Sequence, residues 1–362
     1  MLLKEVYSEK FLQNLVEIIL QFDAEFDAKN FLKIFKDFDK QELKQRMRSI
    51  SIALEKNLSS KNYQSQATVL KQVVSSLPRD KMSGLAFIIF PDFVEIFGLD
   101  DFDFSMQSLE FFTEFGSSEF AVRKFLMLDR KRALGFFKIW SKSKNHHVRR
   151  LASEGLRPRL PWGEALAFFK KDPSEILPII ENLKHDESEY VRKSVANNLN
   201  DISKDHPQVV LNLMQKWKKE KVSEGLIKHA LRTLLKKGDK VALEIIDINC
   251  NNLSENSAIQ SFSLQKEVVK ISGDLIFDFV LENQLQNNKI RLEYVVYFLK
   301  QNGAHSKKNF QIITKNFSQG VFKFSKKHSF RDLSTRKHNA GKHVISLVVN
   351  GIEVQKLEFN LL

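Results

Sequence analysis

The spacing of apolar residues changes from one regular period to another near residue 250, and this change limits the folds open to the chain. Before it, apolar residues recur at helical spacing, as they do across residues 191–202. After it, apolar residues alternate with other residues, as they do across residues 275–281, which is the period of β-strands. A chain of 362 residues is long enough for both kinds of region. The sequence therefore predicts an all-α part followed by an all-β part.

The boundary is predicted in residues 251–257, a polar stretch without periodicity that reads NNLSENS. This linker divides the chain into a helical domain, residues 1–250, and a β domain, residues 258–362. Within the β domain, Asn350-Gly351 separates two alternating runs, which is typical of a tight hairpin. About seven short strands fit this domain, which predicts a small all-β sandwich of immunoglobulin-like type.

A five-residue pattern recurs inside the helical part, with an aliphatic residue, two basic residues, a variable residue and a small or aliphatic residue. It begins at Val122, Val148, Val191 and Ile227. The later spacings suit helix pairs that stack into a solenoid, whereas the first is shorter, so the repeats are irregular. We expect the aliphatic residue to pack inward and the basic pair to point outward. The result would be a basic concave surface.

Positive charge is concentrated in two segments. The chain has 57 basic and 44 acidic side chains, for a formal net charge of +13. Residues 130–159 contain Glu154 as their single acidic residue, and residues 307–342 contain only Asp332. Such segments attract polyanions, and nucleic acid is the first partner that they indicate. A lysine-rich solubilising surface is the alternative interpretation.

Several classes of protein are excluded or disfavoured. The single cysteine, Cys250, excludes an intramolecular disulfide and favours a reducing compartment. The uncharged apolar run at residues 82–91 is too short to cross a membrane, so we expect a soluble cytoplasmic protein with no membrane partner. Signatures of dinucleotide, P-loop and zinc chemistry are missing. We expect the rings of the adjacent His146 and His147 to diverge on a helix, and therefore expect no metal site there.

Carboxylates within the basic segments need an explanation, because phosphate repels them. On a helix, Arg150 at i−4 and Arg157 at i+3 share the face of Glu154. The plain interpretation is a surface salt bridge worth about 0.2–1 kcal/mol. The alternative is a functional acid held between two guanidinium groups.

Three further residues have an ordinary interpretation and a functional one. Trp162 follows two prolines and is by default a core residue. Asp201 lies at the end of a predicted repeat helix, where a loop or capping role is common. Glu119 resembles an acidic residue in the first turn of a helix, a commonplace position.

At these residues the sequence resembles the HEAT-like-repeat DNA alkylation-repair glycosylases, and more narrowly their AlkC branch. The resemblance covers most of residues 1–250. It is most specific in the stretches 147–162, 190–204 and 229–234. Some members of that branch also have a C-terminal immunoglobulin-like domain, which agrees with the predicted β domain.

The resemblance implies a hydrolase of base excision repair that removes N-alkylated bases such as 3-methyladenine from duplex DNA. It implies that the N-glycosidic bond is hydrolysed without flipping the lesion out of the duplex. It carries catalytic roles onto Glu119, Glu154 and Asp201, and a substrate-binding role onto Trp162. No cofactor, no metal and no obligatory protein partner is implied.

Basic residues in both parts are the candidates for contacts with DNA phosphates, which position a duplex without reading its sequence. In the helical part they are Arg150, Arg157, Arg159, Arg192, Lys193 and Arg232. In the β domain they are Lys326, Lys327 and Arg331, which we expect in a sandwich loop that reaches the DNA. The alternative for this charge run is an ordinary solvated loop.

A non-catalytic function is the main alternative for the whole chain. Helical repeats commonly bind protein or nucleic acid as a scaffold, and a fold alone does not specify a function. An RNA-binding repeat protein is disfavoured, because no two-residue base-reading code recurs at constant spacing.

Overall fold

The fold is known from a computed structural model that describes residues 2–249, 257–332 and 337–362. It contains two compact units, Met1–His206 and Pro207–Leu362, and each is described here by itself. The division lies before the expected domain boundary, so the last helices group with the β domain. Apart from Ser257, the predicted linker 251–257 lies outside the described residues.

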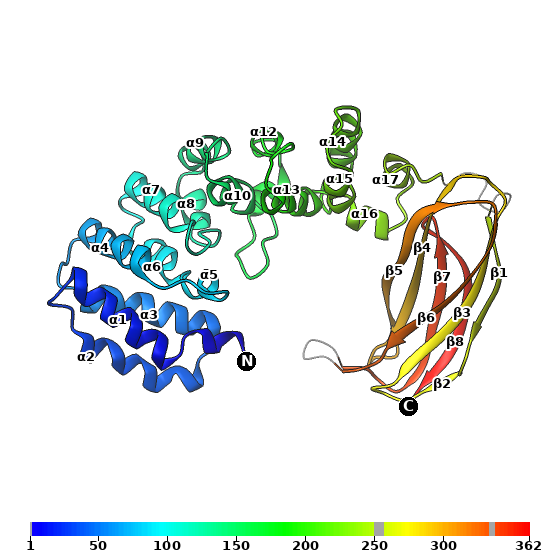
Figure 1. The fold of residues 1–362 in the computed structure, drawn as a ribbon, viewed down its shortest axis with the longest axis horizontal. Helices are drawn as coiled ribbons and strands as arrows, with labels where there is room; N and C mark the ends of the chain where they lie inside the picture. The colour runs from blue at the N-terminus through cyan, green and yellow to red at the C-terminus, as the bar shows by residue number, and fades with distance from the viewer. Residues whose placement is uncertain (1, 250–256, 333–336) are drawn as a thin grey trace. The chain divides into compact units, whose positions relative to one another are not determined.

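The first unit is helical (Figure 1). Its helices are η1 (Leu3–Val6), α1 (Glu9–Phe22), α2 (Ala28–Phe31), η2 (Leu32–Lys40), α3 (Leu43–Asn57), α4 (Tyr63–Ser76), α5 (Ser83–Ala86), α6 (Ile89–Phe97), α7 (Phe102–Phe112), α8 (Val122–Leu128), α9 (Arg130–Trp140), α10 (His146–Glu154), α11 (Ala167–Lys171), α12 (Leu177–Glu181) and α13 (Glu189–Ile202).

The second unit combines four helices with the strands. The helices are α14 (Pro207–Lys219), α15 (Glu224–Ala230), α16 (Arg232–Lys236) and α17 (Lys240–Ile245). The strands are β1 (Ser257–Leu264), β2 (Val268–Val269), β3 (Asp274–Asn283), β4 (Asn288–Leu299), β5 (His305–Phe317), β6 (Gly320–Ser329), β7 (Gly341–Val349) and β8 (Ile352–Leu361).

The helices of the first unit pack mainly against helices that are near them in the chain. Helix α1 packs against α4, α3 against α6, and α10 against both α9 and α13. Aromatic side chains fill the space between the earlier helices, where the rings of Phe90 and Phe112 stack with centroids 5.7 Å apart. Burial of this apolar surface stabilises the stack at about 25 cal/mol for each Å² removed from water.

In the recurring pattern, the aliphatic residue is buried as expected, but the first basic residue does not always point outward. Val122, Val148, Val191 and Ile227 are all buried in helices. The prediction that the basic pair points outward is wrong for Arg123, which is only 2% exposed.

The first basic residue of two later repeats also binds backbone oxygens. The Nη1 atoms of Arg149 and Arg192 donate to carbonyls in the loop that precedes their own helix. Two copies of the pattern therefore use this arginine to fix a loop of the solenoid, and the backbone oxygens satisfy its donors.

The β-strands form a sandwich of two sheets. One sheet has the order β1-β3-β6 and the other has the order β2-β8-β7-β4-β5. All pairs are antiparallel except β2 with β8. The alternating residues of segment 275–281 are buried in the core between the sheets, as predicted. Asn350 and Gly351 form the hairpin between β7 and β8 with φ of 47° and 81°, the left-handed values that a type I′ turn needs.

Strand β4 is buried on both faces, which the alternating pattern did not predict. Its even-numbered residues face the sandwich core, whereas Arg291, Glu293 and Val295 are buried on the opposite side. The helical segment before the linker contacts the five-stranded sheet near the start of β4 and near the hairpin between β7 and β8. Asn350 Nδ2 donates to the carbonyl of Asn249, and Lys289 pairs with Glu224 at 2.9 Å. These contacts explain why α14–α17 belong to the second unit.

The basic run at residues 326–331 differs from its prediction as a loop. Residues 326–329 complete strand β6, which lies at the edge of the three-stranded sheet, and only residues 330 and 331 lie beyond the strand. The run alternates in burial, because successive residues of a strand face opposite sides.

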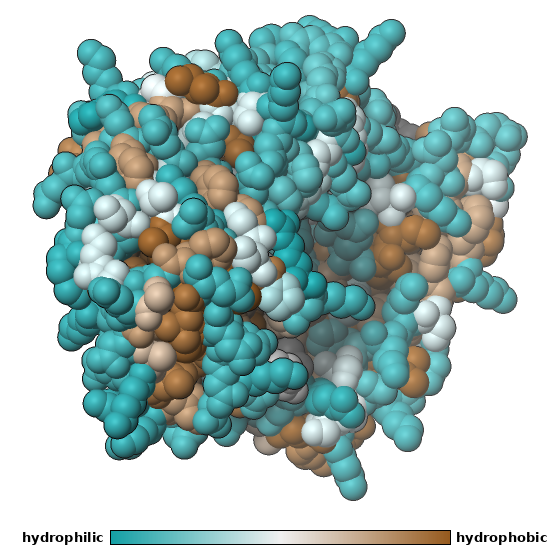
Figure 2. All heavy atoms as spheres, turned by 60° about the vertical axis from the view of Figure 1, so that its left-hand side comes forward, coloured by the Kyte–Doolittle hydropathy of each residue, from teal (hydrophilic) through white to brown (hydrophobic). Residues whose placement is uncertain are grey.

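The described surface is mainly polar. Figure 2 shows a face covered largely by hydrophilic side chains, with hydrophobic side chains in scattered patches. Among the described residues, every helix is too short or too polar to cross a membrane.

Candidate active site at the ends of helices α10 and α13

Two carboxylates occupy corresponding positions at the C-terminal ends of two packed helices. Glu154 is the last residue of α10, and Asp201 is the next-to-last residue of α13. Both are buried, with 5% and 1% of their surface exposed. A negative charge at a helix C-terminus is unfavourable, because the helix dipole is negative there. Acids placed against this rule, and out of water, need strong compensation, and such violations are characteristic of functional sites.

Glycine allows the close packing next to Glu154. A Cβ atom on Gly155 would lie 2.8 Å from the side chain of Val122 and 3.0 Å from the ring of Phe137. Helices α8 and α9 therefore approach the end of α10 closely. A larger residue at position 155 would force these helices apart.

Arg157 links the two carboxylates. Its Nη1 atom donates to Glu154 Oε1 at 2.7 Å, and its Nε atom donates to Asp201 Oδ2 at 2.8 Å. The other oxygens of the carboxylates are also bound: Ser194 Oγ donates to Glu154 Oε2 at 2.6 Å, and Lys204 Nζ lies 2.9 Å from Asp201 Oδ1. Glu154 and Asp201 therefore lie in one hydrogen-bonded cluster.

Glu119 joins the same cluster through Arg150. It lies in the turn before α8, where Arg150 Nη1 approaches its Oε2 atom to 2.5 Å. Arg150 Nη2 lies 3.6 Å from Glu154 Oε1, so this arginine stands between two acids. Ser117 Oγ donates to Glu119 Oε2 at 2.6 Å, and the ring of Tyr190 covers the Arg150 guanidinium at 4.8 Å.

The cluster is a chain of alternating charges, in the order Glu119, Arg150, Glu154, Arg157, Asp201, Lys204. We call it the ion chain. Burial by itself lowers the pKa of Arg150 and of Arg157, but the neighbouring carboxylates outweigh burial, and the net effect raises both pKa values. The arginines therefore stay charged, and each acid has a cation beside it.

Trp162 is presented to solvent on a fixed loop after α10. Its side chain is 62% exposed, which differs from a core residue, and its φ of 64° is unusual for a bulky residue. Arg123 on α8 fixes this loop, because it donates to the carbonyls of Gly155, Arg157 and Glu164 at 3.1, 3.0 and 2.6 Å. Lys44 Nζ donates to the carbonyl of Trp162 itself. Backbone strain of this kind is commonly found at functional sites.

The predicted phosphate-binding residues fall into different environments. Both guanidinium groups of Arg150 and Arg157 are bound within the ion chain, and their side chains are largely buried. Arg159 is more open and pairs with Asp205 at 2.6 Å, and Lys193 is exposed and pairs with Glu189. Arg192 is bound to backbone carbonyls.

The remaining candidates belong to the second unit. Arg232 is half-buried at the first residue of α16. Lys326 is half-buried on β6, Lys327 is exposed and pairs with Asp274 at 3.0 Å, and Arg331 is exposed.

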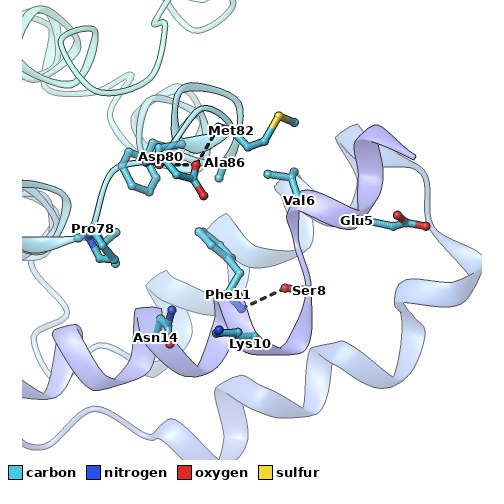
Figure 3. A pocket seen from close by; sticks show the side chains of 13 residues that line it. Glu5, Val6, Ser8, Lys10, Phe11, Asn14, Pro78, Asp80, Met82 and Ala86 are labelled. Carbon is cyan, nitrogen blue, oxygen red and sulfur yellow. Dashed lines mark hydrogen bonds between the residues drawn. The ribbon is translucent and has the colours of Figure 1, made fainter. Parts of the chain in front are cut away.

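A separate hollow lies between η1, α1 and the segment around α5. Figure 3 shows Phe11 from α1 pointing toward Asp80 and Met82 across this hollow. None of the ion-chain residues lines it. Its walls are mixed apolar and polar, and two acidic residues, Glu5 and Asp80, line it. Glu5 accepts from the amide of Leu2, and Asp80 accepts from Ser83 and from the amide of Met82.

Metal ligation is not supported within the described residues, where no group of three or more potential ligands is close enough to hold an ion. The expected divergence of His146 and His147 is wrong, since their ring centroids are 4.2 Å apart. His146 is exposed at the first residue of α10, so its side chain can turn toward its neighbour.

Sequence reasoning missed four residues that support the site: Ser117, Ser194, Tyr190 and Arg123. Ser194 and Tyr190 come from α13, which only the fold brings to Glu154 and Glu119, whereas Ser117 is two residues from Glu119 in the sequence. Arg123 had a signal in the recurring pattern, but the pattern was interpreted as a pair of outward basic residues. The pattern predicted that Val122 is buried, but it gave no sign that the adjacent Arg123 is buried as well.

Comparison with known proteins places this geometry in a class of repair enzymes. The family of DNA alkylation repair enzymes matches residues 113–234, which include the whole ion chain. The C-terminal Ig-like domain of the uncharacterised protein YhaZ matches residues 258–362.

Two relatives match over nearly the full length of the chain. An alkylpurine DNA glycosylase, AlkC from Pseudomonas fluorescens, solved bound to DNA containing an abasic site analog, superposes with a TM-score of 0.94 at 35% identity, covering 100% of both chains. The uncharacterised protein YhaZ of Bacillus subtilis strain 168 is 40% identical over 99% of both chains. The chain belongs to the HEAT-like-repeat DNA alkylation-repair glycosylases, in the AlkC branch with a C-terminal immunoglobulin-like domain.

Proposed function

We propose that this protein excises cationic N-alkylated bases of the 3-methyladenine type from duplex DNA, by hydrolysis of the N-glycosidic bond in base excision repair. One observation carries the proposal. Three carboxylates that the sequence left far apart, Glu119, Glu154 and Asp201, meet in one buried ion chain within the segment matched by the repair family.

The reaction needs a negative charge near the sugar more than it needs a group that donates a proton to the leaving base. A base methylated at a ring nitrogen is cationic and leaves without being protonated. Positive charge then develops on the deoxyribose, as in other glycosyl transfers, and a nearby carboxylate lowers that barrier. Ionised carboxylates can also orient or deprotonate the attacking water. A cluster that holds several acids next to permanent cations suits both tasks.

Exposure separates the roles of the three acids. The side chains of Glu119 and Glu154 are 14% and 7% exposed, whereas that of Asp201 is 1% exposed. We assign Glu154 to stabilise the sugar cation and Glu119 to assist with water. Asp201 is the most buried of the three, and its negative charge acts through Arg157, to which it is bound.

Trp162 supplies the surface that meets the lesion. Its exposed ring stands on a loop fixed by Arg123 and Lys44, so the ring is positioned before DNA arrives. An aromatic face attracts a cationic base or sugar by about 0.5–2 kcal/mol. A tryptophan presented at the surface suits a lesion that stays in the duplex, whereas most glycosylases extrude the base into a pocket.

Duplex DNA is the partner, and exposed basic groups hold its phosphates. We assign this role to Arg159 in the turn after α10, to Lys193 on α13 and to Arg232 on α16. Arg192 steadies the loop before α13. In the β domain, we assign it to Lys326, Lys327 and Arg331 at the end of β6. The AlkC relative is bound to DNA containing an abasic site analog, which supports a DNA partner.

The test is product analysis on methylated duplex DNA. The protein should release free 3-methyladenine and leave abasic sites, and it should release nothing from undamaged DNA of the same sequence. Binding to both duplexes without release of any base would contradict the proposal and favour the non-catalytic scaffold.

A further inference from the structure

Arg157 has a position that contact with a phosphate does not explain. The side chain is 7% exposed, and two of its nitrogens already donate to Glu154 and Asp201. Three of its five N–H donors remain, but a side chain that is 7% exposed presents little of them to a phosphate. Its charge is also fully offset by these two neighbours, so it adds little to the attraction of DNA.

We infer that Arg157 is a positioning residue of the proposed glycosylase reaction, one that keeps Glu154 and Asp201 ionised and fixes Glu154 toward the substrate. The inference rests on the proposed function and deepens it. Arg157 itself acts through the carboxylates and does not touch the reacting atoms.

The physical reason is the instability of two close, buried carboxylates. Burial disfavours the charged form of an acid, and a second negative charge nearby disfavours it further. Both acids also lie at the negative end of a helix, which adds to the penalty. Without the guanidinium, each of the two carboxylates would lose a cation that now lies within 2.8 Å of it. A protonated Glu154 could no longer stabilise the sugar cation.

The shape of arginine matters as well as its charge. The planar guanidinium presents several donors in a fixed fork, so that one group can bind two carboxylates from two helices at once. The backbone of Arg157 is fixed too, because its carbonyl accepts from Arg123 Nη1 at 3.0 Å. Arg157 therefore connects the ends of α10 and α13 to α8. Lysine in this place would keep the charge but could not span both acids.

Other charged groups face the two acids from every neighbouring element, and none replaces Arg157. Arg150 reaches Glu154 only at 3.6 Å and is shared with Glu119. The surrounding titratable groups are Arg123 on α8, Glu119 before it, Arg150 on α10, Arg159 after it, Tyr190 on α13, and Lys204 and Asp205 after it.

The experiment measures single-turnover release of 3-methyladenine from methylated duplex DNA between about pH 5.5 and pH 8.5, together with the salt dependence of binding to a duplex with an abasic-site analogue. The variants are Arg157→Gln and Arg157→Lys. The matched control is Arg159→Gln, which removes a nearby, more exposed arginine. Thermal unfolding of each variant checks that it is folded.

A positioning role predicts a deficit that depends on pH. Arg157→Gln should release base about 100-fold more slowly than the wild-type protein near pH 6, and the deficit should shrink as pH rises and the acids ionise. Arg157→Lys should regain about tenfold of that loss and keep a pH profile close to wild type. Both variants should keep the wild-type salt slope, whereas Arg159→Gln should lower it by about 0.9.

Two results would overturn the inference. One is a deficit in Arg157→Gln that is equal at every pH and accompanied by a shallower salt slope, which would make Arg157 a phosphate contact. The other is a release rate equal to wild type. If the wild-type protein itself releases no base, the proposed function fails instead, and the two failures are thereby distinguished.

Discussion

This protein contains two buried arginine–carboxylate groups that differ in how their members are connected. In the ion chain, Arg157 joins acids from two helices, and each carboxylate oxygen of Glu154 and Asp201 has a partner. In the β domain, Arg291 and Glu293 pair at 2.6 Å on a single strand. Among the described residues, Arg291 Nε and Glu293 Oε2 lack a hydrogen-bond partner.

The β4 pair and the ion chain differ in the number of residues that they connect and in their surroundings. The β4 pair is closed on itself and is covered by the rest of its own unit, as expected for a pair that serves packing. The ion chain extends from the buried Asp201 to the more open Glu119 and lies close to the fixed loop of an exposed tryptophan. We therefore expect changes in the ion chain to affect catalysis more than folding, and changes in the β4 pair to do the reverse.

The largest effect is expected for Glu154→Gln. Glutamine keeps the size of the side chain but removes the charge, so base release should slow by about 10²- to 10⁴-fold while DNA affinity changes little. Single-turnover release of 3-methyladenine measures the first, and binding to an abasic-site duplex measures the second. Release at the wild-type rate would remove Glu154 from the mechanism.

Substitutions in the β4 pair, Arg291 and Glu293, should change the free energy of unfolding and leave base release unchanged. Arg291→Met leaves Glu293 buried without its partner and should lower the free energy of unfolding by about 3–5 kcal/mol, measured by denaturant titration. The double variant Arg291→Leu with Glu293→Leu should recover most of this loss, because it buries no unpaired charge. Base release by the folded double variant should match wild type. A loss of release there would give the β4 pair a functional role.

A smaller effect is expected for Trp162→Ala. The ring is exposed, so stability should change little, but the lost attraction should slow base release by about 3- to 30-fold. Trp162→Phe is the matched control and should retain much of the rate, because it keeps an aromatic face. Equal rates for the alanine, phenylalanine and wild-type proteins would exclude contact between this ring and the lesion.

The last effect concerns stability alone and involves Asp92, a buried acid outside the ion chain. Burial raises its pKa from 3.8 to about 6, and the opposing effects of Ser51 and Arg48 do not cancel this. The folded state therefore binds a proton more tightly than the unfolded state, and stability should fall as pH rises from about 4 to about 6. Asp92→Asn should remove this component, on the order of 3 kcal/mol, from the pH dependence of unfolding. An unchanged pH dependence would contradict it.

The sequence predicted the fold well where one local pattern decided the structure. Alternation placed Leu275 and Phe277 in a sandwich core, and Asn350-Gly351 formed the expected hairpin. Strand β4 was harder, because its second face is buried although it contains the charged Arg291 and Glu293, which an alternating pattern assigns to solvent. The division at His206 was not visible for the same reason, since it depends on contacts between distant segments.

The site was partly predictable. Charge and spacing singled out Glu154 with Arg150 and Arg157, and the family resemblance added Asp201, Glu119 and Trp162. The roles of the arginines could not be read from spacing. Whether a guanidinium faces phosphate or carboxylate depends on what the fold places beside it, and here Asp201 reaches Arg157 from another helix.

The most direct test of the central claim is a double-mutant cycle on Glu154→Gln and Asp201→Asn, with single-turnover base release as the readout. If the two acids act as one unit through Arg157, the double variant should be scarcely slower than the slower single variant. If the two losses multiply, the acids act independently, and the account of a single ion chain is wrong.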